Sequence, residues 1–491
     1  MSDLIEYSYQ KTIGGNEMNR FKIQERGSSI GTEIMAGVTT FFAMCYIVVV
    51  NPAQVSGANS GPIWNSVYIA SILVAVIGTL LMGLYANLPF AQACGMGLNA
   101  FFFVSFILRA IGQEKDVILG YHVGVVIIFL SGIIFLILSV TGLRKYIATA
   151  LPDCLKKSIP AGIGLFIAFI GLQNSAVGLV QYNKYTLVQF FDFHGVVSKV
   201  GKDFSAFDAW CEMAPAVLAI LGLVIIAVLT KMQVRGAIMI SMLLITVLYY
   251  LTTWTAPEFD LGQIGQTFKD FGKYGITGVF DAKAWSTAFS SDFLGGIFGA
   301  VVLIITFCLV DMFDTIGTLY GTASQANMLD DKGDPVDVDK AMMCDSVGTV
   351  TGAVLGTSTC TTFVESAAGV AAGGRTGLTS VVTAACFAVC LFLSPVASIV
   401  PACATSPVLI FVGVLMLKNF AKIDMDDVAS AVPAFLTMIM MVLTYSISNG
   451  IGIGAISYVL ITLLTGKYKK KDITVTIIAL LFVARFLLVT M

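Results

Sequence analysis

Four acidic residues lie inside apolar stretches of the chain: Asp311, Asp314, Asp345 and Glu365. An ionisable side chain in a membrane-spanning segment costs about 2.5–3.5 kcal/mol on insertion scales, so each of these residues suggests a function. Asp311 and Asp314 are three residues apart and would share one face of a helix. Carboxylates accept N–H groups from a polar ligand and can carry a proton. The pattern therefore predicts a ligand-binding or proton-carrying site within the membrane.

Glu365 lies in a segment of unusual composition, 356–377, in which Thr and Ser are followed by small residues and glycines. The first part favours an extended strand and the second a half-helix. Such a break leaves free N–H groups near residues 364–367, next to the Glu365 carboxylate. The segment 91–102, which carries Asn99, is also interrupted by glycines. Paired broken segments indicate the binding site of a secondary transporter.

Each acidic residue also has a structural interpretation. Asp311 is as well explained by a hydrogen bond to a neighbouring helix, and Asp345 by a cap on its own helix. The functional interpretation is favoured for Asp314 and Glu365. The ten cysteines have no metal-ligand spacing and the two histidines are far apart, so we expect no metal and no cofactor apart from a coupling ion.

The composition is that of a membrane protein. Of 491 residues, 57% are hydrophobic and 12% are charged, whereas soluble domains carry about 25% charged residues. Lipid must therefore be the main solvent of the chain. A net charge of −2 gives no reason to expect a nucleic-acid partner.

A membrane-spanning helix needs about 20 apolar residues. Fourteen candidates are found, and a fifteenth apolar stretch, 473–490, follows them. The fourteen are 32–52, 66–86, 93–109, 118–142, 158–173, 212–230, 236–254, 293–319, 342–356, 362–374, 378–399, 405–417, 428–447 and 450–465. Lys and Arg in the connecting loops place the N-terminus in the cytoplasm, and the long polar loops outside.

The two halves of the chain resemble each other. Asn51 matches Asp314 at an offset of 263 residues, and the same offset carries 95–102 onto 358–365. Seven spans per half is an odd number, so the second half would be inverted relative to the first. The alternative is chance similarity between apolar helices.

Three motifs together resemble the AzgA-like purine permeases of the nucleobase/ascorbate transporter (nucleobase:cation symporter-2) superfamily. They are FDTIGTLYG (313–321), GMGLNAFF (95–102) and TSTCTTFVESAAGVAAGGRTGLTS (357–380). The resemblance covers roughly residues 25–466. It implies an all-α membrane protein with a seven-plus-seven inverted repeat, short β-strands in spans three and ten, and core and gate domains.

The resemblance also implies a division of the chain. The expected parts are a cytoplasmic N-terminal tail (1–28), core spans 1–4 (29–145), gate spans 5–7 (146–255), an extracellular loop (256–292), core spans 8–11 (293–400), gate spans 12–14 (401–466), and a basic loop with an extra apolar segment (467–491). We further expect a cell-membrane location and a homodimer formed through the gate domain.

The function implied is import of guanine, hypoxanthine or adenine by proton symport, with Asp314 or Glu365 carrying the proton. By the same resemblance Asp314, Glu365 and Ser366 bind the base, and Asp345 supports the site. The wider superfamily often has a Gln-His pair in span one, and this chain has Thr39-Thr40-Phe41 there. Further expected contacts are Thr40, Phe41, Met96, Asn99, Thr362 and Phe363, with Asp311 and Asn51 as supporting residues and Phe102 as a further stacking partner.

Rival interpretations remain. A transporter of the same fold could carry xanthine, uracil or an anion such as sulfate or bicarbonate, although two acidic residues disfavour a small anion. An intramembrane aspartyl protease is disfavoured because Asp311 and Asp314 are too close on one helix. A channel is disfavoured because no repeated filter is found. We therefore expect no enzyme.

Overall fold

The computed structural model describes residues 20–142, 151–174, 176–201, 204–325, 328–329 and 335–488. Most of the expected N-terminal tail, the expected core–gate boundary at residue 145 and the end of the chain lie outside these ranges. In the described part, eight helices are long and apolar enough to cross a membrane, and five shorter apolar helices accompany them.

The predicted spans are found as helices whose ends agree with the sequence to within several residues. The longer ones are α3 (Ile30–Met44), α4 (Ile47–Ser56), α5 (Pro62–Leu84), α8 (Val117–Thr141), α10 (Asp153–Leu172), α12 (Ala206–Lys231), α13 (Ala237–Thr253), α17 (Gly296–Gln325), α18 (Val338–Leu355), α22 (Ala402–Met416), α23 (Val428–Leu443), α24 (Ile447–Leu464) and α25 (Ile473–Leu488). The shorter ones are α6 (Met96–Phe102), π-helix η1 (Phe103–Leu108), α7 (Arg109–Gly112), α19 (Ser366–Ala371), α20 (Gly377–Val389), 3₁₀-helix η4 (Cys390–Phe392), α21 (Ser394–Ser398) and 3₁₀-helices η5 (Leu417–Lys422) and η6 (Lys470–Asp472).

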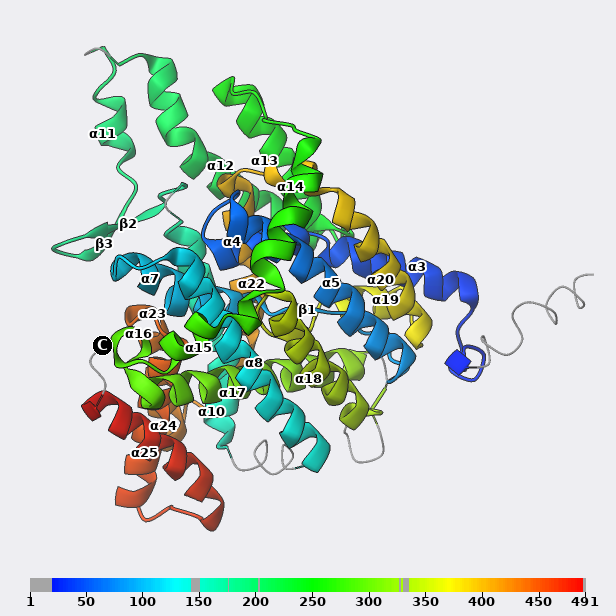
Figure 1. Cartoon of the computed structure of the whole chain (residues 1–491), viewed down its shortest axis with the longest axis vertical. Coiled ribbons are helices and arrows are strands. Elements are labelled where there is room, and N and C mark those ends of the chain that lie inside the picture. Colours follow the sequence, from blue (N-terminus) through cyan, green and yellow to red (C-terminus); the bar gives the residue numbers. More distant parts are fainter. Residues whose placement is uncertain are drawn as a thin grey trace, which may run out of the picture.

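Two short buried strands lie side by side near the middle of the molecule, as expected for spans three and ten (Figure 1). Strand β1 (Gln92–Cys94) pairs antiparallel with β4 (Cys360–Thr362), and Gln92 lies opposite Thr362. Irregular backbone at membrane depth is tolerated where other protein covers it. The ladder supplies the hydrogen bonds that the interrupted helices lack.

The strands correct one detail of the repeat. Strand β1 begins at residue 92 and β4 at residue 360, an offset of 268. The sequence offset of 263 instead carries the segment after β1 onto β4 itself. The error arises because short Gly- and Thr-rich stretches tolerate a shift in alignment without a hydrophobic penalty.

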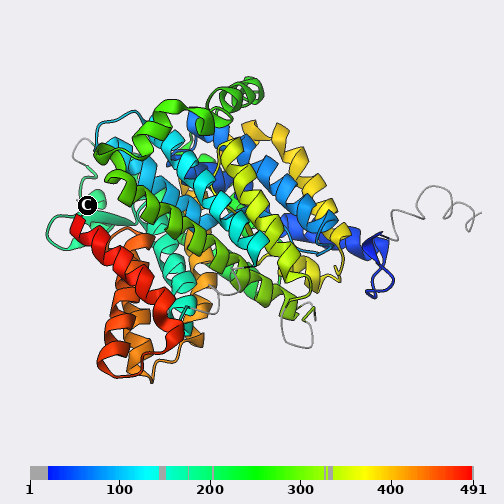
Figure 2. The same cartoon turned by 60° about the horizontal axis from the view of Figure 1, so that its bottom comes forward.

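The helices form two groups. Helices α5, α17 and α18 pack on the strands and, together with α3, α8 and α20, on one another, while α10, α12, α13, α22, α23 and α24 pack mainly on one another. The groups meet where α10 contacts α6 and α17, where α24 contacts α17, and where α13 contacts α3. The extra helix α25 packs on α24 and also contacts α17, and it lies on the outside of the molecule (Figure 2).

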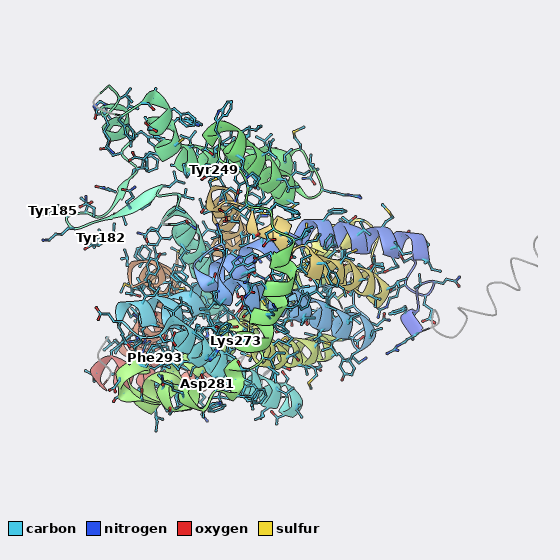
Figure 3. All side chains as sticks on the ribbon, turned by 45° about the horizontal axis from the view of Figure 1, so that its top comes forward. Tyr182, Tyr185, Tyr249, Lys273, Asp281 and Phe293 are labelled. Atoms are coloured by element: carbon cyan, nitrogen blue, oxygen red, sulfur yellow. The ribbon has the colours of Figure 1, made fainter. Side chains whose placement is uncertain are left out.

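The two long connections are structured. Residues 254–295 form α14 (Gly262–Asp270), π-helix η2 (Phe271–Gly275), 3₁₀-helix η3 (Gly278–Phe280), α15 (Ala282–Ala288) and α16 (Ser291–Leu294), and they pack on α5 and α8. The other connection contains hairpin β2 (Val180–Asn183) and β3 (Leu187–Phe190), with Tyr182 and Tyr185 projecting at its tip, followed by α11 (Phe193–Val197) (Figure 3).

Candidate functional site

Glu365 lies between β4 and α19, where span ten is broken. Its side chain is only partly buried. The hydroxyl of Tyr46 donates a 2.6 Å hydrogen bond to its Oε1. Tyr46 is fully buried in the break between α3 and α4. Tyr46, in the break of span one, therefore positions the carboxylate of Glu365, which lies in the break of span ten.

Asp314 lies on α17, which packs against α19. Like Glu365, which directly precedes α19, it is partly exposed. Asp311, one turn earlier on α17, is 1% exposed. The structure therefore separates two accessible carboxylates from the buried acids around them.

Asp345, on α18, is fully buried and accepts hydrogen bonds on both oxygens. Thr315 Oγ1 donates to Oδ2 at 2.6 Å and Gln92 Nε2 donates to Oδ1 at 3.2 Å. The donors come from α17 and β1, so Asp345 joins three elements. The supporting role expected for Asp345 stays a prediction.

Ser366 and Thr362 face the strand pair. Ser366 Oγ accepts the Ala91 N–H at 2.9 Å, and Gln92 Nε2 donates to Thr362 Oγ1 at 3.4 Å. Both hydroxyls are buried. In this conformation they tie the two broken segments together.

Asn51 and Asn99 form a separate buried cluster. Asn99 Nδ2 donates to Asn51 Oδ1 at 2.9 Å, and Ser358 Oγ bonds Asn99 Oδ1. This cluster links α4 to α6 and to the segment before β4. The structure thus places both asparagines together, but in a network of their own.

The predicted aromatic residues differ in their surroundings. Phe41 is partly buried and packs edge-on against Phe387, with ring centroids 5.2 Å apart. Phe363 is 6% exposed and lies two residues before Glu365. Phe102 is fully buried beside Phe106 and Tyr121. Of the three rings, Phe363 is nearest to Glu365 along the chain and Phe102 is enclosed by protein.

Thr40 and Met96 are both buried. Thr40 Oγ1 has no hydrogen-bond partner among the described residues, and it packs directly against Gly369 of α19. Met96 is the first residue of α6, just after β1. Each therefore lies beside one of the two broken segments.

Four residues that hydrogen-bond to the predicted acids were not predicted: Tyr46, Gln92, Thr315 and Thr349, whose hydroxyl contacts Asp311. Tyr46 and Gln92 are polar residues beside breaks in spans one and three, and this position in the sequence could have indicated their importance. The two threonines look like ordinary helix residues, and their partners are fixed only by the fold. Among the described residues, no group of three His, Cys, Asp or Glu side chains is placed to bind a metal ion.

Comparison with known proteins shows the family of the chain. Residues 31–453 match a family model described as the Permease family. The chain is 36% identical to adenine permease AdeQ of Escherichia coli over 490 residues, 98% of each chain. It is 38% identical to guanine/hypoxanthine permease PbuO of Bacillus subtilis over 466 residues, 94% of this chain and 98% of the relative.

Among solved structures, the transmembrane domain of the cyanobacterial bicarbonate transporter BicA superposes with a TM-score of 0.56 at 15% identity. The match covers 85% of this chain and 97% of that domain. At this identity the likeness shows the fold alone, which is a seven-plus-seven inverted repeat. The predictions of a mostly helical membrane protein and of this fold are confirmed, whereas the number of spans and the division into core and gate domains stay predictions. With the match over most of its length, the chain belongs to the Permease family, in its AzgA-like branch, and it is an integral membrane transporter rather than an enzyme.

Proposed function

We propose that the protein is a secondary active transporter that imports the purine nucleobases guanine, hypoxanthine and adenine by proton symport. Relatives that are similar over nearly their full length include an adenine permease and a guanine/hypoxanthine permease. The observation that carries the proposal is the Glu365 carboxylate, fixed by Tyr46 where the breaks of spans one and ten meet, with the partly exposed Asp314 on the adjacent helix α17.

This arrangement suits a purine base. A purine is flat, neutral near pH 7 and rich in N–H donors at its edge. The partly exposed carboxylates of Asp314 and Glu365 offer acceptors, and a few directed acceptors beside apolar surface fix the orientation of such a ligand. Phe363 and Phe41 provide aromatic surface near the start of α19 and on α3. Ser366, Thr362, Thr40, Met96 and Asn99 complete the proposed surroundings of the base.

Proton coupling is assigned to the same two carboxylates. Two like charges close together in a partly desolvated site disfavour simultaneous ionisation, so one proton is readily shared between Asp314 and Glu365. The protonated acid can donate to a ring nitrogen or carbonyl oxygen of the base, while the ionised acid accepts its N–H groups, so the base and the proton bind together. Release of the base removes the acceptor for this proton and favours its loss on the same side, which links the two fluxes in one direction.

Movement is assigned to the two helix groups. The group around the strands is the core domain and carries the site, while the group of α10, α12, α13 and α22–α24 is the gate domain. Few helices connect the groups, as expected for an elevator-like, alternating-access motion of one against the other. We further propose a cytoplasmic N-terminus, a cell-membrane location and a homodimer formed through the gate domain.

The test is uptake of radiolabelled hypoxanthine into cells that lack their own purine permeases. Excess guanine and adenine should compete, uracil and xanthine should compete poorly, and uptake should increase at acid pH. Glu365→Gln and Asp314→Asn should each abolish most uptake. Glu212→Gln, which changes an exposed acid paired with Lys199, should leave uptake unchanged. If the inserted protein showed no saturable purine uptake, the proposal would fail.

A further inference from the structure

The hydroxyl of Thr349, on α18, lies at the centre of a buried hydrogen-bond cluster. Its Oγ1 is 2.8 Å from Asp311 Oδ2 on α17 and 3.1 Å from the carbonyl oxygen of Cys360 on β4. The N–H of Cys360 also donates to it at 3.0 Å. A threonine hydroxyl has one hydrogen and two lone pairs. Because the hydroxyl has a single hydrogen, Thr349 can be the donor in only one of these three contacts.

The backbone of Cys360 depends on Thr349. The bonds from Gly95 N–H to Thr359 O and from Phe363 N–H to Ala91 O flank this position in the ladder. Because hydrogen-bonded and non-bonded pairs alternate in an antiparallel ladder, Cys360 belongs to a non-bonded pair. Its N–H and C=O point away from β1 and meet Thr349. The buried carbonyl of Cys360 therefore needs the single Thr349 hydrogen.

If Thr349 donates to Cys360, the hydrogen in its short contact with Asp311 must come from Asp311. We infer that Asp311 is a protonated carboxylic acid that donates to Thr349, which in turn donates to the Cys360 carbonyl and so positions β4. Asp311 Oδ1 is buried and, like the neighbouring Thr359 hydroxyl, forms no hydrogen bond of normal geometry among the described residues. That is a small cost for a neutral carbonyl oxygen and a large one for a carboxylate.

Asp345 has the opposite surroundings. Both of its oxygens face donors, from Thr315 and Gln92, which suits an ionised carboxylate. Asp311 and Asp345 are both buried on the packed helices α17 and α18, and Thr349, which contacts Asp311, lies one turn from Asp345. Two carboxyl groups that share a buried site do not both ionise readily. The titratable groups that act on Asp311 from α17, α18, β1 and β4 are Asp314, Asp345, Cys308, Cys94 and Cys360. None of these groups is a cation that would favour an ionised Asp311.

The inference deepens the proposed function and rests on it only where it concerns the coupled proton. The proton on Asp311 is structural and stays in place through the transport cycle, so Asp311 is a positioning residue. Asp314 and Glu365 are left as the groups that exchange the coupled proton.

The first test compares Asp311→Asn with Asp345→Asn. The amide introduced by Asp311→Asn can donate to Thr349 as the protonated acid does, so uptake should keep its wild-type rate and pH profile. The amide introduced by Asp345→Asn offers one acceptor oxygen to two donor side chains, so uptake should fall roughly tenfold or more. Loss of pH-dependent uptake in a correctly inserted Asp311→Asn protein would overturn the inference.

The second test does not depend on transport. Infrared spectra of the purified protein at neutral pH should contain a carboxylic-acid C=O band that is lost in Asp311→Asn and kept in Asp345→Asn. Thr349→Val should shift this band, and Thr349→Ser should preserve it. A spectrum in which Asp311→Asn removes no acid band would overturn the inference, even if purine uptake is confirmed. If the band is present and purine uptake is absent, the proposed function fails while the inference stands.

Discussion

Tyr46 and Glu365 are 319 residues apart in sequence and joined by a 2.6 Å hydrogen bond. Tyr46 can reach the carboxylate because α3 ends at Met44 and α4 begins at Ile47, which leaves the tyrosine in the break. The phenol is fully buried, whereas Glu365 is partly exposed. The bond therefore fixes one carboxylate oxygen from the protein side and leaves the other side of the group accessible to a ligand.

Replacing Tyr46 by Phe removes this single donor and little else. Hydrogen bonds to charged groups contribute about 1.5–3 kcal/mol, so we expect the KM for hypoxanthine to rise roughly tenfold or more. Tyr85→Phe is the matched control, because Tyr85 is 55% exposed at the end of α5 and should leave the KM unchanged. Initial uptake rates over a range of hypoxanthine concentrations measure both. An unchanged KM in Tyr46→Phe would remove Tyr46 from the site.

Gly369 allows α19 to lie close against α3. A Cβ atom at this position would overlap Thr40 Oγ1 and approach the Ala36 carbonyl oxygen to 2.8 Å. Overpacking of this kind costs about 1–3 kcal/mol, and here it would push the Glu365 segment away from Tyr46. Gly369→Ala should therefore lower both the thermal stability in detergent and the rate of uptake.

Gly317→Ala provides the control for this change. Gly317 is also a helical glycine, on α17, but a Cβ atom added there would meet no neighbouring atom within 4 Å. This substitution should be neutral or slightly stabilising, because Ala favours a helix over Gly by roughly 1 kcal/mol. Equal behaviour of the two variants would show that the close approach of α19 to α3 has no importance.

Much of the fold could be predicted from the sequence because lipid imposes a simple rule. Apolar runs such as 118–142 must be helices of spanning length, and α8 ends within a residue of that prediction. The breaks at β1 and β4 were also predictable, since Thr- and Gly-rich stretches cannot form ordinary lipid-facing helices. The register between the halves was not, because such stretches carry too little hydrophobic pattern to fix an alignment.

The site was predictable only in part. Asp314 and Glu365 stand out because charge is costly inside a membrane. Tyr46, Gln92 and Thr349 do not stand out, because each is a common residue whose importance comes from a partner on a distant segment. Hydrogen bonds across the repeat are therefore visible only once the two halves are packed together.

Thr315 provides a further test, on stability. Its hydroxyl donates to Asp345 at 2.6 Å, and both residues are fully buried. Thr315→Val leaves one oxygen of a buried carboxylate without its donor, which costs about 1–3 kcal/mol. Thr351→Val is the control, because Thr351 is only partly buried and bonds to Val347 of its own helix. Thermal unfolding should show a clear loss for the first variant and little for the second.

A last prediction concerns pH and the connection formed by residues 254–295, which packs on α8. His122, near the start of α8, contacts Asp281 Oδ2 through Nδ1 at 2.9 Å and the Tyr274 carbonyl through Nε2 at 3.1 Å. Asp281 also accepts the Lys283 N–H at 2.9 Å, and it lies in this connection together with Lys273 (Figure 3). Burial alone would raise the pKa of Asp281. The hydrogen bonds from His122 and the backbone outweigh it and hold this pKa below its ordinary value.

A carboxyl group with a lowered pKa in the folded state stabilises the fold above its ordinary pKa, about 3.9, and this contribution is lost only as the pH falls through the lower folded-state pKa. Asp281→Asn should therefore lower the thermal stability at pH 7, and the difference from wild type should persist undiminished at pH 5. Thermal unfolding of both proteins in detergent at several pH values measures this difference. A gap that closes between pH 7 and pH 5 would mean that Asp281 titrates in that range, in contradiction to the arrangement around His122.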